Sequence, residues 1–262
     1  MVFTQENSLS TEQEQLASTF AQEGYVVLDL ELSKEEMDTV LRDLNGKFQK
    51  GLFAYDTRIQ NAWKNHESVL HIAKLPRILD LLRVLYQREP IPFQTLNFCA
   101  GTEQRGHSDA VHFHSLPYHF LCGVWVALED IDAENGPLFY YPKSHTLPVI
   151  EPAYFNWKPE ADYKKYENYI EQLIEDKGLE RKELHIKKGQ ALIWAANLIH
   201  GGSRVLNKNR TRFSQVTHYY FENCIYYAPW GSNLALGNIQ RKKITNISTS
   251  ETVPHMCNGE VV

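Results

Sequence analysis

Residues 189–202 read Gly-Gln-Ala-Leu-Ile-Trp-Ala-Ala-Asn-Leu-Ile-His-Gly-Gly. This run predicts an apolar strand that delivers His200 at its end, and the two glycines mark a place where the backbone must approach closely. A shorter motif, His107-Ser-Asp109, ends 91 positions before His200 (200 − 109). Alternate residues of an extended chain point to the same side, so its imidazole and carboxylate converge on one point. A separation of this size suits two opposite strands of one barrel.

Short strands dominate the chain from Ile91 onward. Runs rich in Val, Ile, Phe, Tyr and Trp alternate with turn-forming clusters, among which Asn135-Gly136 is a strong turn signal. The pattern predicts five strands: Pro92–Ala100, Phe120–Leu128, Pro137–Tyr141, Gln190–Trp194 and Ser214–Phe221. Many short strands within about 130 residues favour a barrel or jelly roll over a sheet of βαβ units.

The N-terminal third is predicted to be helical. Ser10 and Ser33 each precede a Gln or Glu by three residues, which is the pattern of a capping box, and each opens an amphipathic run. Leu75–Arg88 has apolar residues on one helical face, and the short run Gly24–Leu30 is strand-like.

No linker or repeat divides the chain, so we expect one domain over residues 1–262. Its parts are a helical N-terminal part at about 10–90, a β core at about 91–228, an insertion at about 150–188 and a peripheral C-terminal segment at about 229–262. Lys158–Gly178 within the insertion is charged and rich in tyrosine, which indicates a partly helical segment between strands. Arg241-Lys-Lys243 in the C-terminal segment is interpreted as a solvated run.

The composition narrows the classes of function. The 262 residues include 27 basic and 32 acidic side chains, and this net charge of −5 argues against binding to nucleic acid or an anionic membrane. No apolar run approaches the ~18–20 residues of a membrane helix. The polar start Met1–Gln15 does not resemble a secretory signal, and four widely spaced cysteines do not suggest a disulfide framework. We therefore expect a soluble, cytoplasmic protein.

The residues His107, Asp109 and His200 have the composition of a 2-His-1-carboxylate facial triad, which holds Fe(II) in non-haem oxygenases and leaves coordination positions open. The H-x-D motif alone carries little weight, because it arises by chance in histidine-rich chains, and a surface polar pair is the alternative. His112-Phe-His114 also offers two imidazoles on one face. A cupin-type site on that pair would need a glutamate soon afterwards, and Ser115–Cys122 contains none.

The segment Arg210-Thr-Arg212-Phe-Ser214 opens the last predicted strand. An arginine there can hold one end of a dicarboxylate through a bidentate pair, which lysine cannot reproduce. The residues alone leave both arginines as candidates.

In their order, these motifs resemble the phytanoyl-CoA dioxygenase (PhyH) family of Fe(II)/2-oxoglutarate-dependent oxygenases. The resemblance extends from about Ser10 to Phe221. It includes the opening Phe20–Leu28, the runs Val124–Ile131 and Glu134–Leu138, and Tyr141–His145, where Lys143 replaces the usual glycine.

The resemblance implies a mainly β fold, a double-stranded β-helix of the jelly-roll, cupin-like type with flanking N-terminal α-helices. It implies Fe(II), with 2-oxoglutarate and O₂ as co-substrates. The site residues that it implies are the iron ligands His107, Asp109 and His200 and the 2-oxoglutarate contacts Arg212, Ser214 and Trp125.

The activity implied by the resemblance is hydroxylation of an unactivated C–H bond of a small-molecule metabolite, with release of succinate and CO₂. Desaturation, cyclisation, halogenation and a non-catalytic metabolite-binding role are the alternatives, and halogenation would need the position of Asp109 vacated for chloride. Acidic residues dilute the lysines of the insertion, so we expect a small substrate without coenzyme A. The insertion lies between the two halves of the metal motif, which suggests a lid or wall over the substrate.

Overall fold

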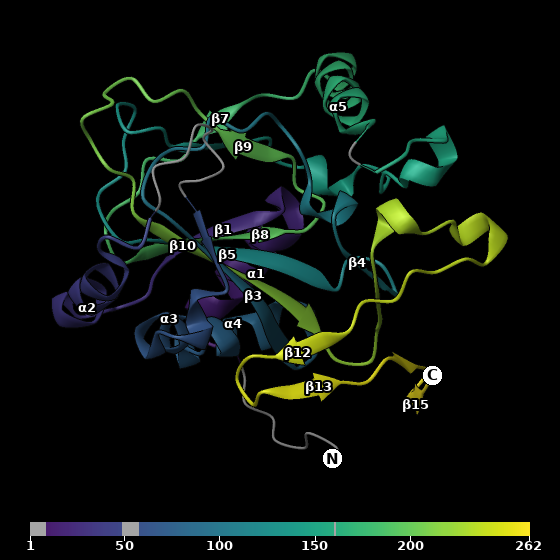
Figure 1. Ribbon diagram of the computed structural model, residues 1–262, viewed down its shortest axis with the longest axis horizontal. Coiled ribbons are helices and arrows are strands. Elements are labelled where there is room, and N and C mark those ends of the chain that lie inside the picture. Colours follow the sequence, from purple (N-terminus) through teal and green to yellow (C-terminus); the bar gives the residue numbers. More distant parts are fainter. Residues whose placement is uncertain (1–8, 49–57, 160) are drawn as a thin grey trace.

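The computed structural model describes residues 9–48, 58–159 and 161–262 of the chain. Its strands form several antiparallel sheets, and helices lie against them (Figure 1). The first eight residues, on which part of the signal-peptide expectation rests, lie outside the described residues. Among the helices that the structure describes, none is long and apolar enough to cross a membrane.

Four helices come early in the chain: α1 (Thr11–Glu23), α2 (Lys34–Leu44), α3 (Glu67–Ala73) and α4 (Pro76–Tyr86). Both predicted capping boxes form. The hydroxyl of Ser10 accepts the N–H of Gln13, and the hydroxyl of Ser33 accepts the N–H of Glu36. Each Gln or Glu side chain accepts the N–H of its serine in return. These bonds satisfy N–H groups that the start of a helix leaves without a partner.

Six strands form the largest sheet: β1 (Tyr25–Asp29), β2 (Arg58–Gln60), β3 (Pro90–Phe98), β5 (Leu121–Ala127), β8 (Gln190–Ala195) and β10 (Ser214–Phe221). Their order across the sheet is β1–β8–β5–β10–β3–β2, and every neighbouring pair is antiparallel. All residues of β5 and β10 are buried. This explains why β5 is a continuous apolar run instead of a polar–apolar alternation. Strand β10, in contrast, buries four polar side chains: Ser214, Gln215, Thr217 and His218.

A smaller sheet faces the large one and consists of β7 (Lys182–Glu183), β6 (Leu138–Tyr140) and β9 (His200–Gly202), in that order. Trp125 and Leu192 of the large sheet pack in one buried cluster with Leu138 and Tyr140 of the small sheet. In Figure 1, β7 and β9 lie on one side of the large sheet, and α3 and α4 lie on the other. All five predicted strands are present with ends within two residues of the prediction. The mainly β class with N-terminal helices is confirmed at this level.

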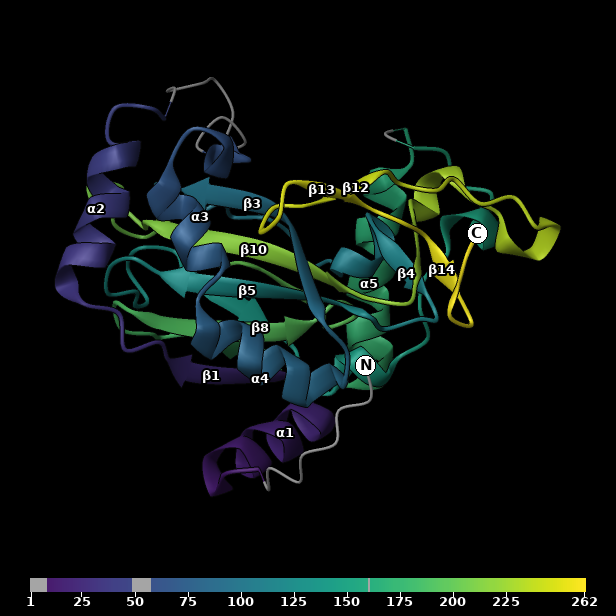
Figure 2. The same cartoon turned by 90° about the horizontal axis from the view of Figure 1, so that it is seen from below.

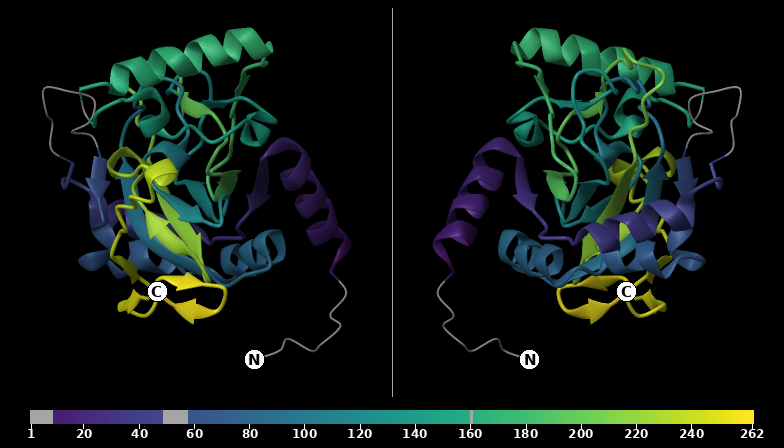
Figure 3. Two further views of the ribbon diagram at one scale, coloured as in Figure 1. Left: turned by 90° about the vertical axis from the view of Figure 1, so that its right-hand side faces the viewer. Right: turned by 90° about the vertical axis from the view of Figure 1, so that its left-hand side faces the viewer.

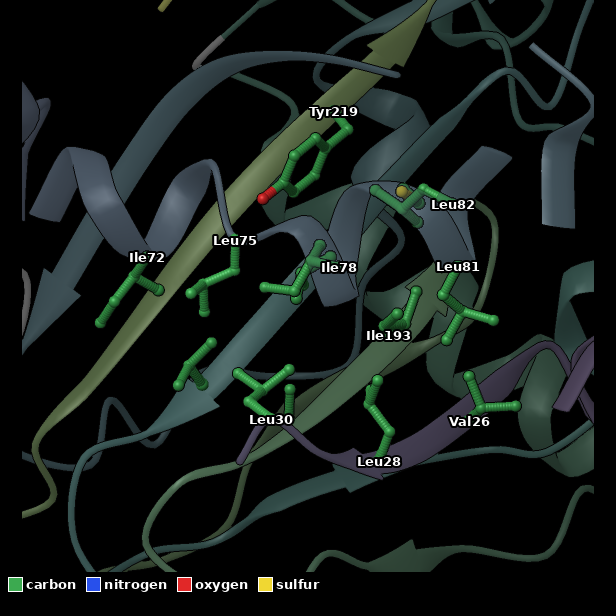
Figure 4. Packing of buried hydrophobic residues seen from close by; sticks show 14 of the residues in the cluster. Val26, Leu28, Leu30, Ile72, Leu75, Ile78, Leu81, Leu82, Ile193 and Tyr219 are labelled. Atoms are coloured by element: carbon green, nitrogen blue, oxygen red, sulfur yellow. The ribbon is translucent and has the colours of Figure 1, made fainter. Parts of the chain in front are cut away.

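The helices close one face of the large sheet with apolar packing. Figure 4 shows Ile78, Leu81 and Leu82 of α4 beside Ile193 of β8 and Leu28 of β1, all within one buried cluster. A site with access to a ligand is therefore expected on the other face, between the two sheets.

The C-terminal segment runs along one edge of the large sheet. Just before it, β11 (Ile225–Tyr227) pairs with β4 (His114–Leu116). The segment itself contains two pairings: β12 (Ile244–Asn246) with β13 (Glu251–Val253), and β14 (Met256–Cys257) with β15 (Glu260–Val261). The N–H of Ile247 donates to the carbonyl of Pro92 in β3 at 2.9 Å, and the side chains of Ile244 and Ile247 are buried. Figure 2 shows β12 and β13 beside β3.

The insertion contains α5 (Tyr163–Lys177), which falls within the stretch predicted to be partly helical. Ile170 of α5 packs with Ile199, the residue before β9, so the helix lies on the side of the small sheet (Figure 3). Residue 160 of this stretch lies outside the described residues.

Candidate metal centre

Three side chains from distant parts of the chain meet between the two sheets: His107, Asp109 and His200. One ligand atom from each lies within 4.8 Å of the other two, and each residue is 6% exposed. Within residues 9–48, 58–159 and 161–262, this is the one group of three His, Cys, Asp or Glu side chains close enough to hold a metal ion. The structure thus brings together the three ligands predicted from the sequence.

The backbone that carries these ligands is held across a strand pair. The N–H of His107 donates to the carbonyl of His200, and the N–H of His200 donates to the carbonyl of His107, both at 2.9 Å. Ser108 is extended (φ −115°, ψ 144°), and Asp109 begins the 3-10 turn η3 (Asp109–Val111). The extended serine turns the flanking imidazole and carboxylate to the same side, as the H-x-D spacing predicts.

The glycines after His200 permit the close approach that the sequence predicts. A Cβ on Gly201 would lie 2.4 Å from the Phe139 ring and 2.6 Å from the carbonyl oxygen of Gln104. A Cβ on Gly202 would lie 2.8 Å from the hydroxyl of Thr102. A larger residue at either position would push β9, and with it His200, away from the neighbouring loop.

Each histidine ligand presents Nε2 to the centre. Nδ1 of His107 lies 3.0 Å from the carbonyl oxygen of Arg105, and Nδ1 of His200 lies 3.0 Å from that of Leu198. Because a carbonyl only accepts, Nδ1 carries the proton in both rings and Nε2 keeps its lone pair for a metal. The side-chain nitrogen of Gln104 lies 3.3 Å from the same Nε2 of His107.

Two further side chains orient the carboxylate of Asp109. The indole N–H of Trp194 donates to Oδ2 at 2.7 Å, and Nε2 of His218 lies 3.4 Å from the same oxygen. The other oxygen, Oδ1, lies 3.9 Å from Nε2 of His200. One carboxylate oxygen is therefore held by its neighbours, and the other faces the histidine ligands.

Trp194 reaches Asp109 because the residue opposite it is a glycine. Gly123 of β5 pairs in register with Trp194 of β8. A Cβ on Gly123 would lie 2.4 Å from atoms of the indole ring. The indole thus occupies the space that any other residue at this position would fill.

The protonation states of the cluster suit a metal ion. Burial, and then the neighbouring His200, lower the pKa of His107 to about 3, so the ring is neutral near pH 7. Burial opposes ionisation of Asp109, yet His200 and His218 hold the pKa of its carboxyl well below the usual range. A buried carboxylate is costly unless a cation pairs with it. Neutral imidazoles with an ionised carboxylate are the ligand forms that bind metals.

Arg212 is a buried cation with unused donors. It is 1% exposed, and its Nη2 donates to the carbonyl of Ala100 at 3.2 Å. Its Nε and Nη1 have no hydrogen-bond partner among the described residues. Burial lowers the pKa of Arg212 to about 10, so the guanidinium keeps its charge at neutral pH. Arg210, the other candidate, forms an ion pair with Asp132 at 2.7 Å instead.

One cavity of about 370 Å³ contains the three ligands and Arg212 in its wall. Trp125 lines this cavity, and its ring lies 5.6 Å from the Arg212 guanidinium carbon. Ser214 does not line the cavity, although its hydroxyl is buried without a partner among the described residues. Strand alternation puts Ser214 on the same face as Val216 and His218, which do line the cavity.

Sequence reasoning missed Trp194, His218 and Gln104 as parts of the centre. His218 lies four residues after Ser214 and so shares its face of β10. The rival pair His112 and His114 separates in the structure. His112 lines the cavity, whereas His114 is fully buried and stacks on Tyr118, with ring centroids 5.0 Å apart.

The described part of the insertion does not cover the cavity, since no described residue of 150–188 lines it. Instead, α5 packs behind the H-x-D loop. The hydroxyl of Tyr166 accepts the N–H of Ser108 at 2.8 Å, and Arg105 forms an ion pair with Glu167 at 3.0 Å. The insertion therefore supports the metal loop from outside and does not form the predicted lid.

Comparison with known proteins gives a family match over most of the chain. The family "Phytanoyl-CoA dioxygenase (PhyH)" matches residues 20–213, which is 194 of the 262 residues (213 − 20 + 1). Phytanoyl-CoA dioxygenase domain-containing protein 1 from Mus musculus is 32% identical over 97 residues. This match covers 35% of the chain and 33% of the relative, so the chain aligns with about a third of that relative's length.

Solved structures share the fold. The epimerase SnoN in complex with Fe³⁺, alpha ketoglutarate and nogalamycin RO superposes with a TM-score of 0.62 at 20% identity, covering 82% of this chain and 86% of SnoN. EctD from S. alaskensis with 2-oxoglutarate and 5-hydroxyectoine superposes with a TM-score of 0.61 at 19% identity, covering 84% of this chain and 79% of EctD.

Proposed function

This chain belongs to the phytanoyl-CoA dioxygenase family, and from that membership we propose that it is an Fe(II)- and 2-oxoglutarate-dependent dioxygenase. Its proposed reaction is hydroxylation of an unactivated C–H bond of a small-molecule metabolite, with release of succinate and CO₂. One observation carries the proposal: a buried His107–Asp109–His200 cluster shares a cavity with Arg212, a buried cation with unpartnered donors.

The strand arrangement supports a double-stranded β-helix core. The order β3–β10–β5–β8 within the large sheet faces β7–β6–β9, and the bridge between His107 and His200 extends the small sheet by one position. In this arrangement the two halves of the metal motif lie at adjacent positions of one sheet, although they are far apart in the chain.

The donor set fits iron. His107 and His200 would each contribute Nε2, and Asp109 would contribute Oδ1, the oxygen that Trp194 does not hold. Iron bound together with 2-oxoglutarate supplies the power to oxidise an inert C–H bond with O₂. The protein's share is to fix the ligands, and the carbonyl partners of both Nδ1 atoms do this by setting the ring orientation.

Arg212 fits the far carboxylate of 2-oxoglutarate. An arginine presents several donors in a planar fork, which matches a carboxylate in a bidentate pair. Two of these donor atoms, Nε and Nη1, have no partner among the described residues, and a buried cation in that state is costly until an anion binds. Phe98 and Trp125 lie beside the guanidinium, at 5.7 and 5.6 Å, and exclude water from this end.

The presence of Asp109 supports hydroxylation over halogenation, because a halogenase of this family leaves that position to chloride. We retain the expectations of a small substrate without coenzyme A and of a cytoplasmic location. Product analysis with labelled O₂ distinguishes hydroxylation, which transfers one oxygen atom to the product, from desaturation or cyclisation, which transfers none.

An anaerobic titration tests the cofactors. Fe(II) and 2-oxoglutarate added to the protein should produce the weak visible charge-transfer band of the chelate, and Asp109→Ala should abolish it. Arg212→Gln should weaken 2-oxoglutarate binding by roughly 30- to 150-fold, the equivalent of about 2–3 kcal/mol for a buried charge pair that loses one partner.

The matched control is Arg210→Gln, two residues away, which removes a partly exposed ion pair with Asp132 and should leave the band unchanged. Absence of the band in the native protein would refute the cofactor assignment. Equal losses in the two arginine variants would refute the role of Arg212. Succinate release stimulated by one of a set of metabolites would then identify a substrate.

A further inference from the structure

A lysine from the C-terminal segment lines the cavity. Lys242 belongs to the run Arg241-Lys-Lys243, which the sequence suggests is solvated, but only Arg241 and Lys243 are exposed. The side chain of Lys242 is half-buried, and its Nζ lies 5.7 Å from the centre of the Phe113 ring, another cavity-lining residue. The segment therefore contributes a cation to the same cavity as the metal ligands.

The backbone around Lys242 is fixed on both sides. Its N–H donates to the carbonyl of Tyr226 at 2.9 Å, and Arg241 forms a β-bridge with Tyr227. Two residues later, the side chain of Ile244 is 3% exposed and packs in the buried cluster that contains Tyr226. The position of Lys242 is thus set by the fold, as expected for a residue that contacts a ligand.

No carboxylate of the described residues forms an ion pair with Lys242, whereas Arg212 has 2-oxoglutarate as its proposed partner. Asp109 is the one acidic residue among the described residues that line the cavity, against the three cations Arg58, Arg212 and Lys242. In the proposed loaded site, the charges of the metal, Asp109, the 2-oxoglutarate dianion and Arg212 cancel. The positive charge of Lys242 is then not offset by any other acidic residue among the described residues that line the cavity.

We propose that the substrate carries an anionic group, a carboxylate or a phosphate ester, and that Lys242 binds this group. The proposal rests on the proposed function, because it assigns the cavity beyond the cofactors to the substrate. Burial lowers the pKa of Lys242, and an anion that pairs with it would offset that cost. Gln60 and Gln94 line the same cavity and offer amide donors to the anion's oxygens.

The size of the cavity limits the rest of the substrate. About 370 Å³ must hold 2-oxoglutarate as well as the substrate, and this is at the low end of ~300–1,000 Å³ for ligand pockets. A compact metabolic acid fits this space better than a coenzyme A thioester does. Phe113, beside Lys242, offers an apolar surface to the part of the substrate next to its anionic group.

Ligand-observed NMR on a redox-silent complex tests the proposal. The protein is loaded with Zn(II) and saturating 2-oxoglutarate, so that Arg212 is engaged and no turnover occurs. Three probes of similar shape are compared: benzoate, phenyl phosphate and the neutral benzamide. We expect at least one anion to bind roughly five- to tenfold more tightly than benzamide, as for a partly desolvated ion pair.

Variants assign the preference to a residue. Lys242→Gln should reduce the anion preference to below about twofold, and Lys242→Arg should keep it, because the charge remains. Lys243→Gln, at the exposed neighbouring position, is the matched control and should bind like the native protein. The anion with the larger preference identifies the head group as carboxylate or phosphate.

Two results would overturn the inference: benzamide binding as tightly as both anions, or an anion preference that survives in Lys242→Gln. In the second case, loss of the preference in Arg58→Gln would assign the contact to Arg58. A separate calorimetric titration of 2-oxoglutarate into the Zn(II) protein reports on the proposed cofactor. No binding of 2-oxoglutarate in that titration would contradict the proposed function. The comparison of Lys242→Gln with Lys243→Gln reports on the anion site alone.

Discussion

Replacing Trp194 with phenylalanine removes one hydrogen bond from the metal centre and keeps an aromatic ring in place. The indole N–H donates to Oδ2 of Asp109 at 2.7 Å, and both residues are buried. In Trp194→Phe, His218, 3.4 Å from the same oxygen, is the remaining described neighbour that holds it. The carboxylate then has more freedom to turn Oδ1 away from the histidine ligands.

The expected loss of Fe(II) affinity follows from the kind of hydrogen bond that is removed. A hydrogen bond to a buried charged group contributes ~1.5–3 kcal/mol, and removing such an outer partner of a metal ligand costs roughly 10–100-fold in affinity. Because His218 stays in place, we take a value of about 2 kcal/mol, which corresponds to about 30-fold weaker Fe(II) binding.

The assay is anaerobic competition of the metal-free protein against a chromophoric Fe(II) chelator, without 2-oxoglutarate. Trp125→Phe is the matched control. It removes an equally buried indole from the neighbouring strand and the same cavity, but Trp125 makes no hydrogen bond to Asp109. Thermal unfolding of both variants measures the cost of the smaller ring separately from the cost to the metal site.

We expect Trp194→Phe to bind Fe(II) about 30-fold more weakly than the native protein, and Trp125→Phe to remain within about threefold of it. Equal Fe(II) affinities for the two variants would refute the argument, because the indole N–H would then not orient Asp109. An equal loss of Fe(II) affinity in both variants would come from packing and not from the hydrogen bond.

Three further predictions concern residues around the same centre. Gly123→Ala should displace the Trp194 indole, weaken Fe(II) binding like Trp194→Phe, and lower the free energy of unfolding by ~1–3 kcal/mol through overpacking; native-like Fe(II) affinity would contradict it. Tyr166→Phe leaves the buried N–H of Ser108 without its acceptor and should cost ~1–3 kcal/mol of unfolding free energy in a denaturant titration, whereas an unchanged midpoint would show that the contact contributes nothing. Because the pKa of Arg212 is lowered only to about 10, its charge is lost only as the pH rises through that value, so calorimetric 2-oxoglutarate affinity should be nearly constant from about pH 6.5 to 8.5.

The strands were predictable where one physical signal dominated. Phe120–Leu128 and Gln190–Trp194 lie in the buried centre of the sheet, so nearly every position had to be apolar or aromatic, and the run identified the strand. The short strands β7 and β9 have two and three residues, too few for any periodicity to appear. Pairing across the small sheet defines them, and pairing depends on the fold as a whole.

The candidate metal ligands were predictable because coordination demands particular atoms at a particular spacing. Two ligands on one extended segment must be two residues apart, and His107-Ser-Asp109 meets that demand. The residues that orient them have no such signature. Trp194 acts on Asp109 only because Gly123, on another strand, leaves room for the indole, and the sequence does not reveal that these two residues are opposite each other.

Lys242 shows how the part of the site that faces the substrate escapes prediction. A charge near a substrate needs no fixed spacing, so a basic run has the same pattern whether it is solvated or lines a cavity. The distinguishing signal was the next part of the chain, where Ile244 and Ile247 are buried and anchor the segment against the sheet. A basic residue two positions before a buried anchor cannot move freely in solvent. The anchor that fixes the C-terminal segment therefore also fixes which of the three basic side chains can reach the metal cavity.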